Sequence, residues 1–417
     1  MKISEHIAIY VHDNVDREWL LGEITGGHLF DFSKDLQELH GEIFSNVLLQ
    51  RFIEEEIKHG HFEIETLNHN PLVTSSSGEQ RKALLNHILS KKPAYIVLDN
   101  MYDSLDSAAR EFTLAIMEAA AANTILIQVL SRKDDCLPFI NTVYSITGYS
   151  IRAKQNKAEF LGSLAAAHHF NGAIPPPLKQ YAAEKNPLVK MSEISVEFHG
   201  RKILQNITWQ INAGEFWQLT GPNGSGKSTL VSLVTGDSPK GYGQQLELFG
   251  KQKGSGETVW DIKEKIGYFT PTMIQQFERQ DSVERMVIGG LYDSVGLYIK
   301  PTERQVKLAY EWLKLIGLSG GRNKPFRLLP SGMQRMILII RAMIKHPPLL
   351  ILDEPTSGLD DDSAATFVAF INKIASETTT AIVYISHRSE SGLSPSAVYE
   401  LLPSATGSVG KVKYIMG

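Results

Sequence analysis

Residues 221–229 constrain this chain more than any other stretch. They read Gly-Pro-Asn-Gly-Ser-Gly-Lys-Ser-Thr and fit the pattern G-x-x-x-x-G-K-[ST]. Residues 215–220 before them have the composition of a buried strand, and residues 230–235 after them have the apolar spacing of a helix that ends at Gly236. This order predicts a phosphate-binding loop, because glycines let backbone N–H groups close around phosphate oxygens and the helix N-terminus adds partial positive charge.

The residues of the loop have separate expected roles. Lys227 would reach the β- and γ-phosphates of a nucleotide, and Ser228 would bind Mg²⁺. The alternative, a glycine-rich surface turn with a chance lysine, leaves both flanks and the motifs further along unexplained. We expect the nucleotide to be bound by Gly221, Pro222, Asn223, Gly224, Ser225, Gly226, Lys227, Ser228 and Thr229.

Size and composition indicate an ordinary globular protein with two domains. The 417 residues exceed what one core usually holds. A hydrophobic share of 42% and a charged share of 21% are typical of soluble proteins. The net charge of −4, without a long run of Lys or Arg, makes bulk attraction to nucleic acid unlikely as the main activity, although a local basic patch remains open.

The sequence also bears on location. The single cysteine, Cys136, excludes an internal disulfide framework and suits a reducing cytosol, and we interpret it as an inert thiol. The most apolar window, residues 115–130, is interrupted by Glu118, Asn123 and Gln128, so we expect no membrane span. Residues 5 and 6 are Glu and His, where a signal peptide needs an apolar core, so we expect a cytoplasmic protein.

The start of the chain is less informative. Residues 7–11 and 19–24 are predicted strands, and residues 36–60 have a helical pattern in which Glu54, Glu55 and Glu56 would face solvent. Residues 26–28 read Gly-Gly-His without a Lys followed by Ser or Thr. If a phosphate loop once lay there, it has lost its binding residues.

Two stretches of the chain repeat the same order of elements. Residues 77–81 read S-G-E-Q-R and open a helix; a buried strand then ends at Asp99, followed by Asn100, and the next strand is followed by Ser131. Residues 331–335 read S-G-M-Q-R, and their strands lead to Asp353, Glu354 and His387. Asp99 lies as far after Gly78 as Asp353 lies after Gly332, so we interpret the chain as an internal duplication.

A proline-rich segment separates the two halves. Residues 175–177 are all proline, and such a stretch ends helices and forms a stiff linker. We place a first domain at residues 1–171, a linker at 172–188 and a complete nucleotide-binding domain at 189–417.

The phosphate loop, the S-G-x-Q segment, the sequence Leu-Asp-Glu-Pro at 352–355 and a histidine after the next strand resemble, in this order, an ATP-binding cassette (ABC) ATPase. The resemblance covers residues 188–415 fully and 36–170 in part. It implies an α/β fold with two P-loop NTPase domains, each a mostly parallel sheet with a helical subdomain, the first truncated and degenerate. Residues 290–298 further resemble the tandem-cassette, ModF-like proteins associated with molybdate transport.

The resemblance implies roles for individual residues. Asp353 would hold Mg²⁺, Glu354 would polarise the attacking water, and His387 would bind the γ-phosphate and that water. Phe198 stands where the family places an aromatic ring against adenine; a buried strand residue is the alternative. The metal-sensing glutamine of the family is expected near position 271, which is Pro271, with Gln275 and Gln276 only downstream, so the resemblance does not extend to coupling through that loop.

Such cassettes work in head-to-tail pairs, which makes the two sites of this chain unequal. The site of the second cassette would be completed by Ser77, Gly78, Glu79 and Gln80 of the first. The opposite site would lack a phosphate loop and would have Asn100 and Ser131 in place of Glu354 and His387, while Met333 departs from the usual small residue. We predict one hydrolytic and one inert site, with pairing either inside one chain or between two chains.

Three functions are compatible with these residues. The first is a cytoplasmic ABC ATPase, either free or peripheral at the inner membrane, that drives or regulates a membrane permease. The second is a non-transport ABC ATPase that acts on nucleic acid or ribosomes, against which the short linker and missing first phosphate loop argue. The third is a nucleotide-gated switch with little turnover.

Overall fold

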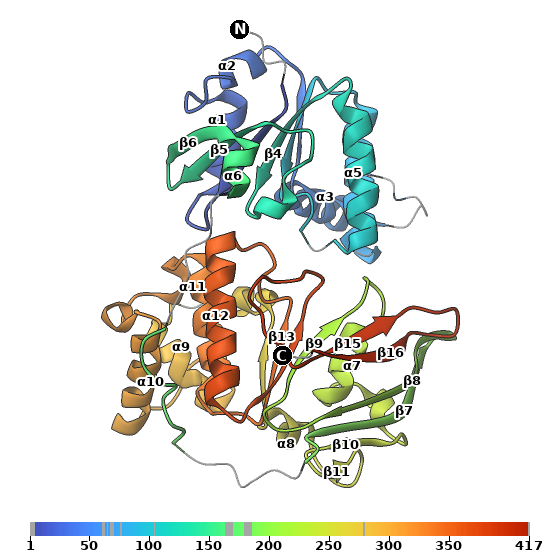
Figure 1. The fold of residues 1–417 in the computed structure, drawn as a ribbon, viewed down its shortest axis with the longest axis vertical. Helices are drawn as coiled ribbons and strands as arrows, with labels where there is room; N and C mark the ends of the chain where they lie inside the picture. The colour runs from blue at the N-terminus through green and yellow to red at the C-terminus, as the bar shows by residue number, and fades with distance from the viewer. Residues whose placement is uncertain are drawn as a thin grey trace. The chain divides into compact units, whose positions relative to one another are not determined.

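The chain folds into two compact units (Figure 1). The computed structural model describes residues 5–60, 63–64, 66, 71–75, 77–103, 105–162, 170–178, 186–277 and 280–415. Unit 1 consists of Met1–Ala166 with Gly358–Ser363, and unit 2 consists of Ala167–Ser357 with Ala364–Gly417. Part of the predicted linker, residues 179–185, lies outside the described residues, and the domain boundaries stay a prediction.

Unit 1 is built on one six-stranded sheet. All neighbours run parallel except the last pair, which is antiparallel. The strands lie in the order β2 (Gly41–Phe44), β3 (Tyr95–Asp99), β4 (Ile125–Leu130), β1 (Ile7–Val11), β5 (Thr142–Thr147) and β6 (Ser150–Asn156).

Helices cover both faces of this sheet. They are α1 (Arg17–Gly26), α2 (Ser33–Leu36), α3 (Asn46–His59), α4 (Ser77–Ser90), α5 (Ser107–Ala121) and α6 (Lys157–Gly162). Ile7 and Ile9 of β1 pack in one core with Leu20 of α1, whereas Ala8 of β1 packs in another with Leu84 of α4. This alternation follows from the pleat of a strand, which directs successive side chains to opposite faces.

Three predictions for unit 1 are wrong. Residues 19–24 belong to α1 rather than to a strand, because the Asp16 side chain caps the helix by accepting a hydrogen bond from the Trp19 N–H, and Leu20 and Ile24 bury one face at helical spacing. Residues 36–60 contain the edge strand β2 before α3 begins. Glu56 is buried rather than solvated, and it accepts the backbone N–H of Leu72 at 2.9 Å.

Unit 2 repeats the strand order of unit 1 and adds a second sheet. Its six-stranded sheet runs β12 (Ile266–Phe269), β13 (Leu349–Asp353), β14 (Ala381–Ile385), β9 (Phe216–Thr220), β15 (Ala397–Leu402) and β16 (Val409–Tyr414), again parallel except for the last pair. The antiparallel sheet runs β11 (Lys251–Gln252), β10 (Leu246–Leu248), β7 (Val189–Phe198) and β8 (Arg201–Ile211). The repeated order confirms the duplicated pattern and the α/β fold class.

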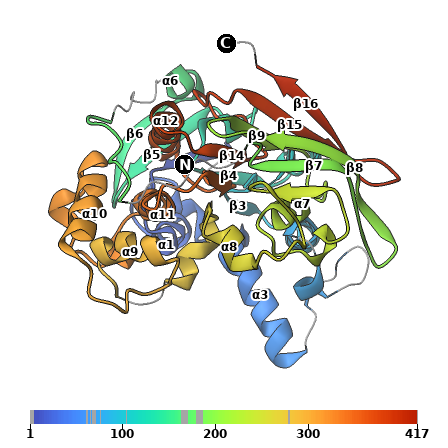
Figure 2. The same ribbon diagram turned by 90° about the horizontal axis from the view of Figure 1, so that it is seen from below.

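The helices of unit 2 include a helical segment that is longer than the corresponding segment of unit 1. They are α7 (Lys227–Val234), α8 (Val259–Lys263), α9 (Val283–Gly289), α10 (Glu303–Leu315), α11 (Ser331–Met343) and α12 (Asp361–Glu377). Between β12 and β13 the chain forms α9, α10 and α11, whereas between β2 and β3 the described part of unit 1 forms α3, a short turn and α4. Figure 2 shows α9 and α10 on the opposite side of unit 2 from β7 and β8.

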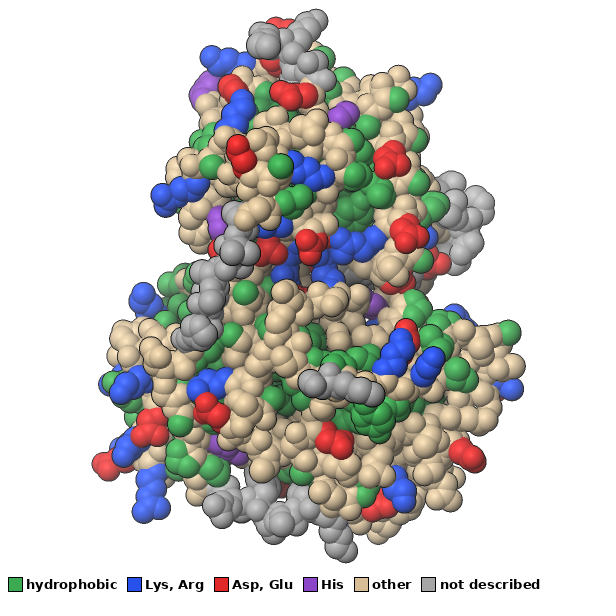
Figure 3. Space-filling view, in the orientation of Figure 1, with side chains coloured by type: hydrophobic (Ala, Val, Ile, Leu, Met, Phe, Trp, Pro, Cys, Tyr) green, Lys and Arg blue, Asp and Glu red, His purple; other side chains and the backbone are tan. Residues whose placement is uncertain are grey.

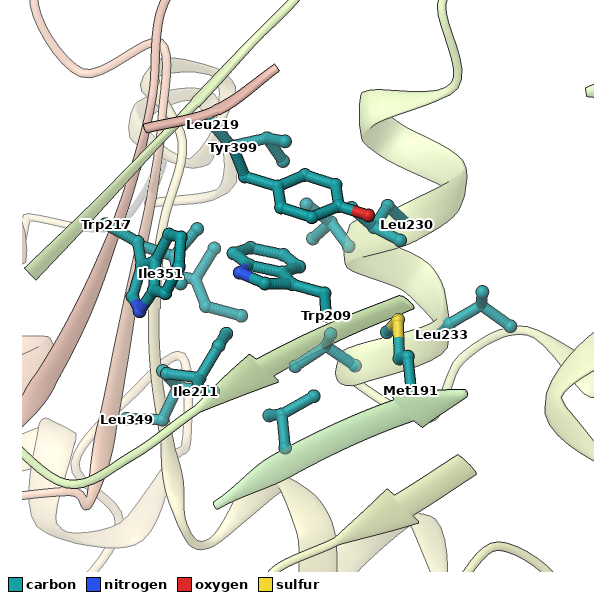
Figure 4. Close-up of a cluster of buried hydrophobic side chains, with 14 of the residues drawn as sticks. Met191, Trp209, Ile211, Trp217, Leu219, Leu230, Leu233, Leu349, Ile351 and Tyr399 are labelled. Atoms are coloured by element: carbon teal, nitrogen blue, oxygen red, sulfur yellow. The ribbon is translucent and has the colours of Figure 1, made fainter. Parts of the chain in front are cut away.

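Aromatic rings join the two sheets of unit 2 (Figure 4). The Trp209 ring of β8 stacks on Tyr399 of β15 with the ring centroids 4.5 Å apart, and it meets Trp217 of β9 edge to face. Leu230 and Leu233 of α7 complete the same core. Both β9, the strand before the phosphate loop, and α7, the helix after it, therefore pack against the same core.

The surface is mixed in charge. On the face drawn in Figure 3, acidic and basic side chains are interspersed on each unit. No helix in the described part of the chain is long and apolar enough to cross a membrane.

Candidate functional site

The phosphate loop joins β9 to α7 in unit 2. Gly226 is the residue before α7 and lies in the left-handed region with φ 95°, and no side chain caps the helix. At Gly221, with φ 145°, an added Cβ would lie 2.8 Å from the Leu401 carbonyl oxygen. Both positions need glycine, so the loop keeps a tight curve and an open helix N-terminus, the arrangement that binds phosphate groups.

Lys227 lies buried under this loop. Its Nζ atom donates to the carbonyl oxygens of Gly221 at 2.8 Å and Pro222 at 3.1 Å, and it lies 3.4 Å from His387 Nδ1. The buried Ser225 hydroxyl nearby has no hydrogen-bond partner among the described residues. A buried ammonium and an unsatisfied hydroxyl beside a glycine cradle fit an anionic phosphate chain, which offers acceptors for both.

Two carboxylates follow at the end of β13. Asp353 receives a hydrogen bond from the Tyr268 hydroxyl of β12, with the oxygens 3.4 Å apart, and burial raises the pKa of its carboxyl. Glu354 adopts φ 48°, and its N–H donates to the Ile385 carbonyl at 2.9 Å. A glutamate in the left-handed region is uncommon and strained, so its placement is set by the surrounding structure.

His387 follows β14, the strand between β13 and β9. Its Nε2 lies 3.2 Å from Glu354 Oε1, while its Nδ1 faces Lys227. The site therefore gathers at the carboxyl ends of three neighbouring strands: β13 ends at the carboxylates, β14 ends before the histidine, and β9 ends at the loop. Parallel strands place these ends at one edge of the sheet, where open α/β sheets bind ligands.

The donor set also fits a divalent cation. Ser228 and Asp353 both line a pocket of about 420 Å³, and hydroxyl and carboxylate oxygens are the ligands that Mg²⁺ prefers. The metal keeps several ligands from water and phosphate, so few protein oxygens suffice. The residues present thus fit Mg²⁺ bound together with a nucleoside triphosphate.

Strand, glycine loop, buried lysine, metal-side aspartate and neighbouring glutamate define unit 2 as a P-loop nucleoside triphosphatase domain. Residues 204–357 match the family model described as ABC transporter. The chain is 38% identical over 327 residues to the ABC transporter ATP-binding protein ModF of Escherichia coli, covering 76% of this chain and 67% of that one. It is 30% identical over 382 residues to an uncharacterized ABC transporter ATP-binding protein of Schizosaccharomyces pombe, covering 90% and 74%.

The chain belongs to the ABC transporter ATP-binding family and is an ABC-type ATPase that binds ATP. Its tandem fold is similar to that of archaeal ABCE1 in a model of ribosome-bound archaeal Pelota and ABCE1, with a TM-score of 0.68, 13% identity and coverage of 98% of this chain and 75% of that chain. At that identity the likeness shows the fold alone.

Phe198 lies at the end of β7, in the antiparallel sheet. Its side chain is 39% exposed, and the Lys240 ammonium lies 5.4 Å from the ring centroid. Gly200 of the turn after it and Arg201 to Ile203 at the start of β8 line the same pocket of about 630 Å³ as Gly224 of the phosphate loop. Phe198 itself does not line that pocket, and its stacking against adenine stays a prediction.

The S-G-E-Q segment forms the start of α4 in unit 1. The Ser77 side chain lies outside the described residues, Gly78 is open around its Cα, and Glu79 is exposed. Gln80 has a structural partner, because its Nε2 donates to the Leu72 carbonyl at 2.7 Å. Gln334 of α11 likewise donates to the Leu329 carbonyl at 3.0 Å. Both glutamines tie a helix start to the turn before it.

Two sequence expectations need correction or addition. Residues 26–28 are not a former phosphate loop, because Gly26 is the last residue of α1 and lies one helix beyond the end of β1. In the segment of Pro271, Gln275 and Gln276 are exposed, and Tyr268 is the residue that contacts Asp353. The contact of Tyr268 was missed, because only the pairing of β12 with β13 brings the two side chains together.

Proposed function

We propose that the chain hydrolyses Mg²⁺-ATP at one composite site, built from the phosphate loop of unit 2 and the S-G-E-Q segment of unit 1. The observation that carries the proposal is the asymmetry between corresponding strand ends. In unit 2 these ends hold Glu354 and His387 beside Lys227. In unit 1 they hold Asn100 and Ser131.

The chemistry of these residues supports one hydrolytic site. Glu354 is an acceptor for the proton of an attacking water, whereas an asparagine amide carries no charge and accepts no proton at neutral pH. His387, close to both Glu354 and Lys227, would orient the water and the γ-phosphate. Mg²⁺, when held by Ser228 and Asp353, would neutralise charge that develops on the phosphate oxygens.

A link to a membrane permease is supported by a groove that reaches the metal side of the site. The pocket with Ser228 and Asp353 is also lined by Trp260, whose side chain is 75% exposed, and by Asp237 and Lys263, which form an ion pair of 2.7 Å. A partner segment in this pocket would contact the residues that hold the metal. We therefore propose a permease as partner and a cytoplasmic location, peripheral at the inner membrane.

The alternatives make different predictions. A protein that acts on ribosomes would co-purify with RNA at low salt, because contacts with phosphate groups weaken as salt rises. A nucleotide-gated switch would bind Mg²⁺-ATP with little turnover whether or not a permease is present. Steady-state ATPase measurements with and without a candidate permease separate this switch from the proposed function.

The composite site is tested by counting nucleotides in a Glu354→Gln variant. We expect turnover to fall about 10²-fold or more, the usual range for loss of a general base, and one ATP to stay tightly bound per chain. The matched control is Asn100→Gly in unit 1, which suits the left-handed backbone at φ 44° and should leave turnover unchanged. Two tightly bound ATP molecules per monomeric chain would contradict the proposal.

A further inference from the structure

The end of β1 in unit 1 corresponds to the phosphate loop of unit 2, and strand register shows which residues match. In each sheet, the aspartate at the end of one strand pairs with a residue of the neighbouring strand. That residue pairs in turn with a residue of the strand that corresponds to the one before the phosphate loop. The residues matched in this way are Asp99 with Ile9 in unit 1 and Asp353 with Leu219 in unit 2. The two units can therefore be compared residue by residue.

Counted from these residues, Arg17 occupies the position of Lys227. Arg17 lies as far after Ile9 as Lys227 lies after Leu219. Each is also the first residue of its helix, α1 or α7. The phosphate-binding lysine of unit 2 thus has an arginine as its counterpart in unit 1.

The Arg17 guanidinium binds the residues that match the catalytic groups of unit 2. Its Nη1 lies 3.1 Å from Asp99 Oδ1, and its Nη2 donates to the Ser131 hydroxyl at 2.6 Å. The Ser131 hydroxyl lies 3.4 Å from Asn100 Oδ1. We call Arg17, Asp99, Asn100 and Ser131 the unit 1 cluster.

The backbone of the unit 1 cluster keeps the geometry of the ATP site although its chemistry differs. Asn100 adopts φ 44°, close to the 48° of Glu354. Its N–H donates to the Val129 carbonyl at 2.9 Å, as the Glu354 N–H donates to Ile385 at 2.9 Å. The side chains therefore differ between the two units, whereas the backbone conformation at this position is the same.

The start of α1 is closed to anions. The Asp16 carboxylate accepts a hydrogen bond from the Trp19 N–H at 3.1 Å, at the position that Gly226 has before α7. A carboxylate there occupies the helix N-terminus and repels a phosphate group, whereas glycine leaves it open.

We infer that the unit 1 cluster is a self-liganded site, in which Arg17 supplies the positive charge that a lysine and a divalent cation provide in an ATP site. Asp99 is mostly buried, with its side chain 13% exposed, and a buried carboxylate needs a paired cation. A guanidinium has several donors in a fixed fork, so one side chain reaches both Asp99 and Ser131. The unit 1 cluster then keeps one structure in the presence and absence of nucleotide.

The test is a double-mutant cycle on the full chain, followed by hydrogen exchange of β3 and β4 peptides. Arg17→Met removes the cation that is hydrogen-bonded to Asp99 and leaves it only the charge of Arg81, and we expect the melting temperature of unit 1 to fall by about 5 °C or more. Arg17→Met/Asp99→Asn removes both charges, and we expect it to recover most of this loss. Arg152→Met, at an exposed position of β6, is the matched control and should cause no shift.

Two further measurements keep the inference testable if Arg17→Met folds poorly. Arg17→Lys keeps the charge but loses the fork, so we expect a smaller fall in melting temperature. In the wild-type chain, Mg²⁺-ATP should not change hydrogen exchange in β3 and β4. Asp99→Asn alone completes the cycle, and additive effects of Arg17→Met and Asp99→Asn, or protection of these strands by Mg²⁺-ATP, would overturn the inference. The inference does not depend on hydrolysis in unit 2, so it can fail while the proposed function holds.

Discussion

At the scale of single residues, the two units differ in the side chains at matched positions and in what the cation at the start of the helix contacts. Lys227 in unit 2 lies 3.4 Å from His387, which in turn contacts Glu354. In unit 1 the first residue of the corresponding helix is Arg17, which forms an ion pair with Asp99. A cation that is paired with a carboxylate inside the protein is not available to bind phosphate. This difference between the two units is sufficient to distinguish a phosphate-binding site in unit 2 from a structural ion pair in unit 1.

A second buried group in unit 2 predicts how stability changes with pH. Burial lowers the pKa of His346 below its ordinary value of 6.5, and its Nε2 has no hydrogen-bond partner among the described residues. Below pH 6.5 the unfolded chain therefore binds a proton more readily than the folded one, so stability is present above that pH and is lost as pH falls.

We predict that His346→Asn reduces this loss. Asparagine tolerates the left-handed backbone at φ 50° and does not titrate in this range. Melting temperatures of the wild type and the variant, measured from pH 7.5 down to 5.5, should show the steeper decline in the wild type. Parallel curves would show that the pKa of His346 is the same in the folded and unfolded states.

At the scale of elements, the helices α4 and α11 start with nearly the same sequence but have different expected uses. Both begin at the serine of the S-G-x-Q segment, and a glutamine ties each to the preceding turn. Only α4 would face a complete ATP site, because the phosphate loop that could use α11 is replaced by the unit 1 cluster. Equal local structure therefore does not imply equal function.

The variants Ser77→Arg and Ser331→Arg test this difference. In the proposed composite site, Ser77→Arg places a bulky cation beside the triphosphate, and we expect ATP hydrolysis to fall about 10²-fold or more. Ser331→Arg makes the same change at the start of α11 and should retain most of the activity. Circular dichroism and melting temperature would establish that both variants fold. Full activity of Ser77→Arg would exclude unit 1 as the signature donor.

At the scale of the whole molecule, one strand order occurs twice with different additions. Unit 2 has a second sheet and the longer helical segment between β12 and β13, whereas the described part of unit 1 has neither. In the proposed composite site, one chain would supply both the phosphate loop and the S-G-E-Q segment, and such closure would need no second chain.

We therefore predict that ATP does not change the oligomeric state. Light scattering of Glu354→Gln should give the mass of one chain both without nucleotide and with Mg²⁺-ATP, and Lys227→Ala serves as the control that does not retain ATP. A mass that doubles only when Glu354→Gln holds ATP would instead show pairing between the unit 2 cassettes of two chains.

The sequence by itself determined the phosphate loop and the repeated order of elements, and it predicted the residues of the second site. These features are local: glycines with fixed spacing, and strands that end in Asp353 or precede His387, are visible because neighbours along the chain decide them. The sequence also indicated Asn100 and Ser131 as inert, since residue type limits their chemistry.

Only the tertiary structure decided the position of the degenerate loop and the partners of its residues. Local apolar spacing cannot distinguish a short strand from a short helix at residues 19–24, and the cap made by Asp16 settles that question. The equivalence of Arg17 and Lys227 depends on register between strands that are more than a hundred residues apart in sequence. Pairing at that separation is set by the packing of the whole sheet, which no local pattern contains.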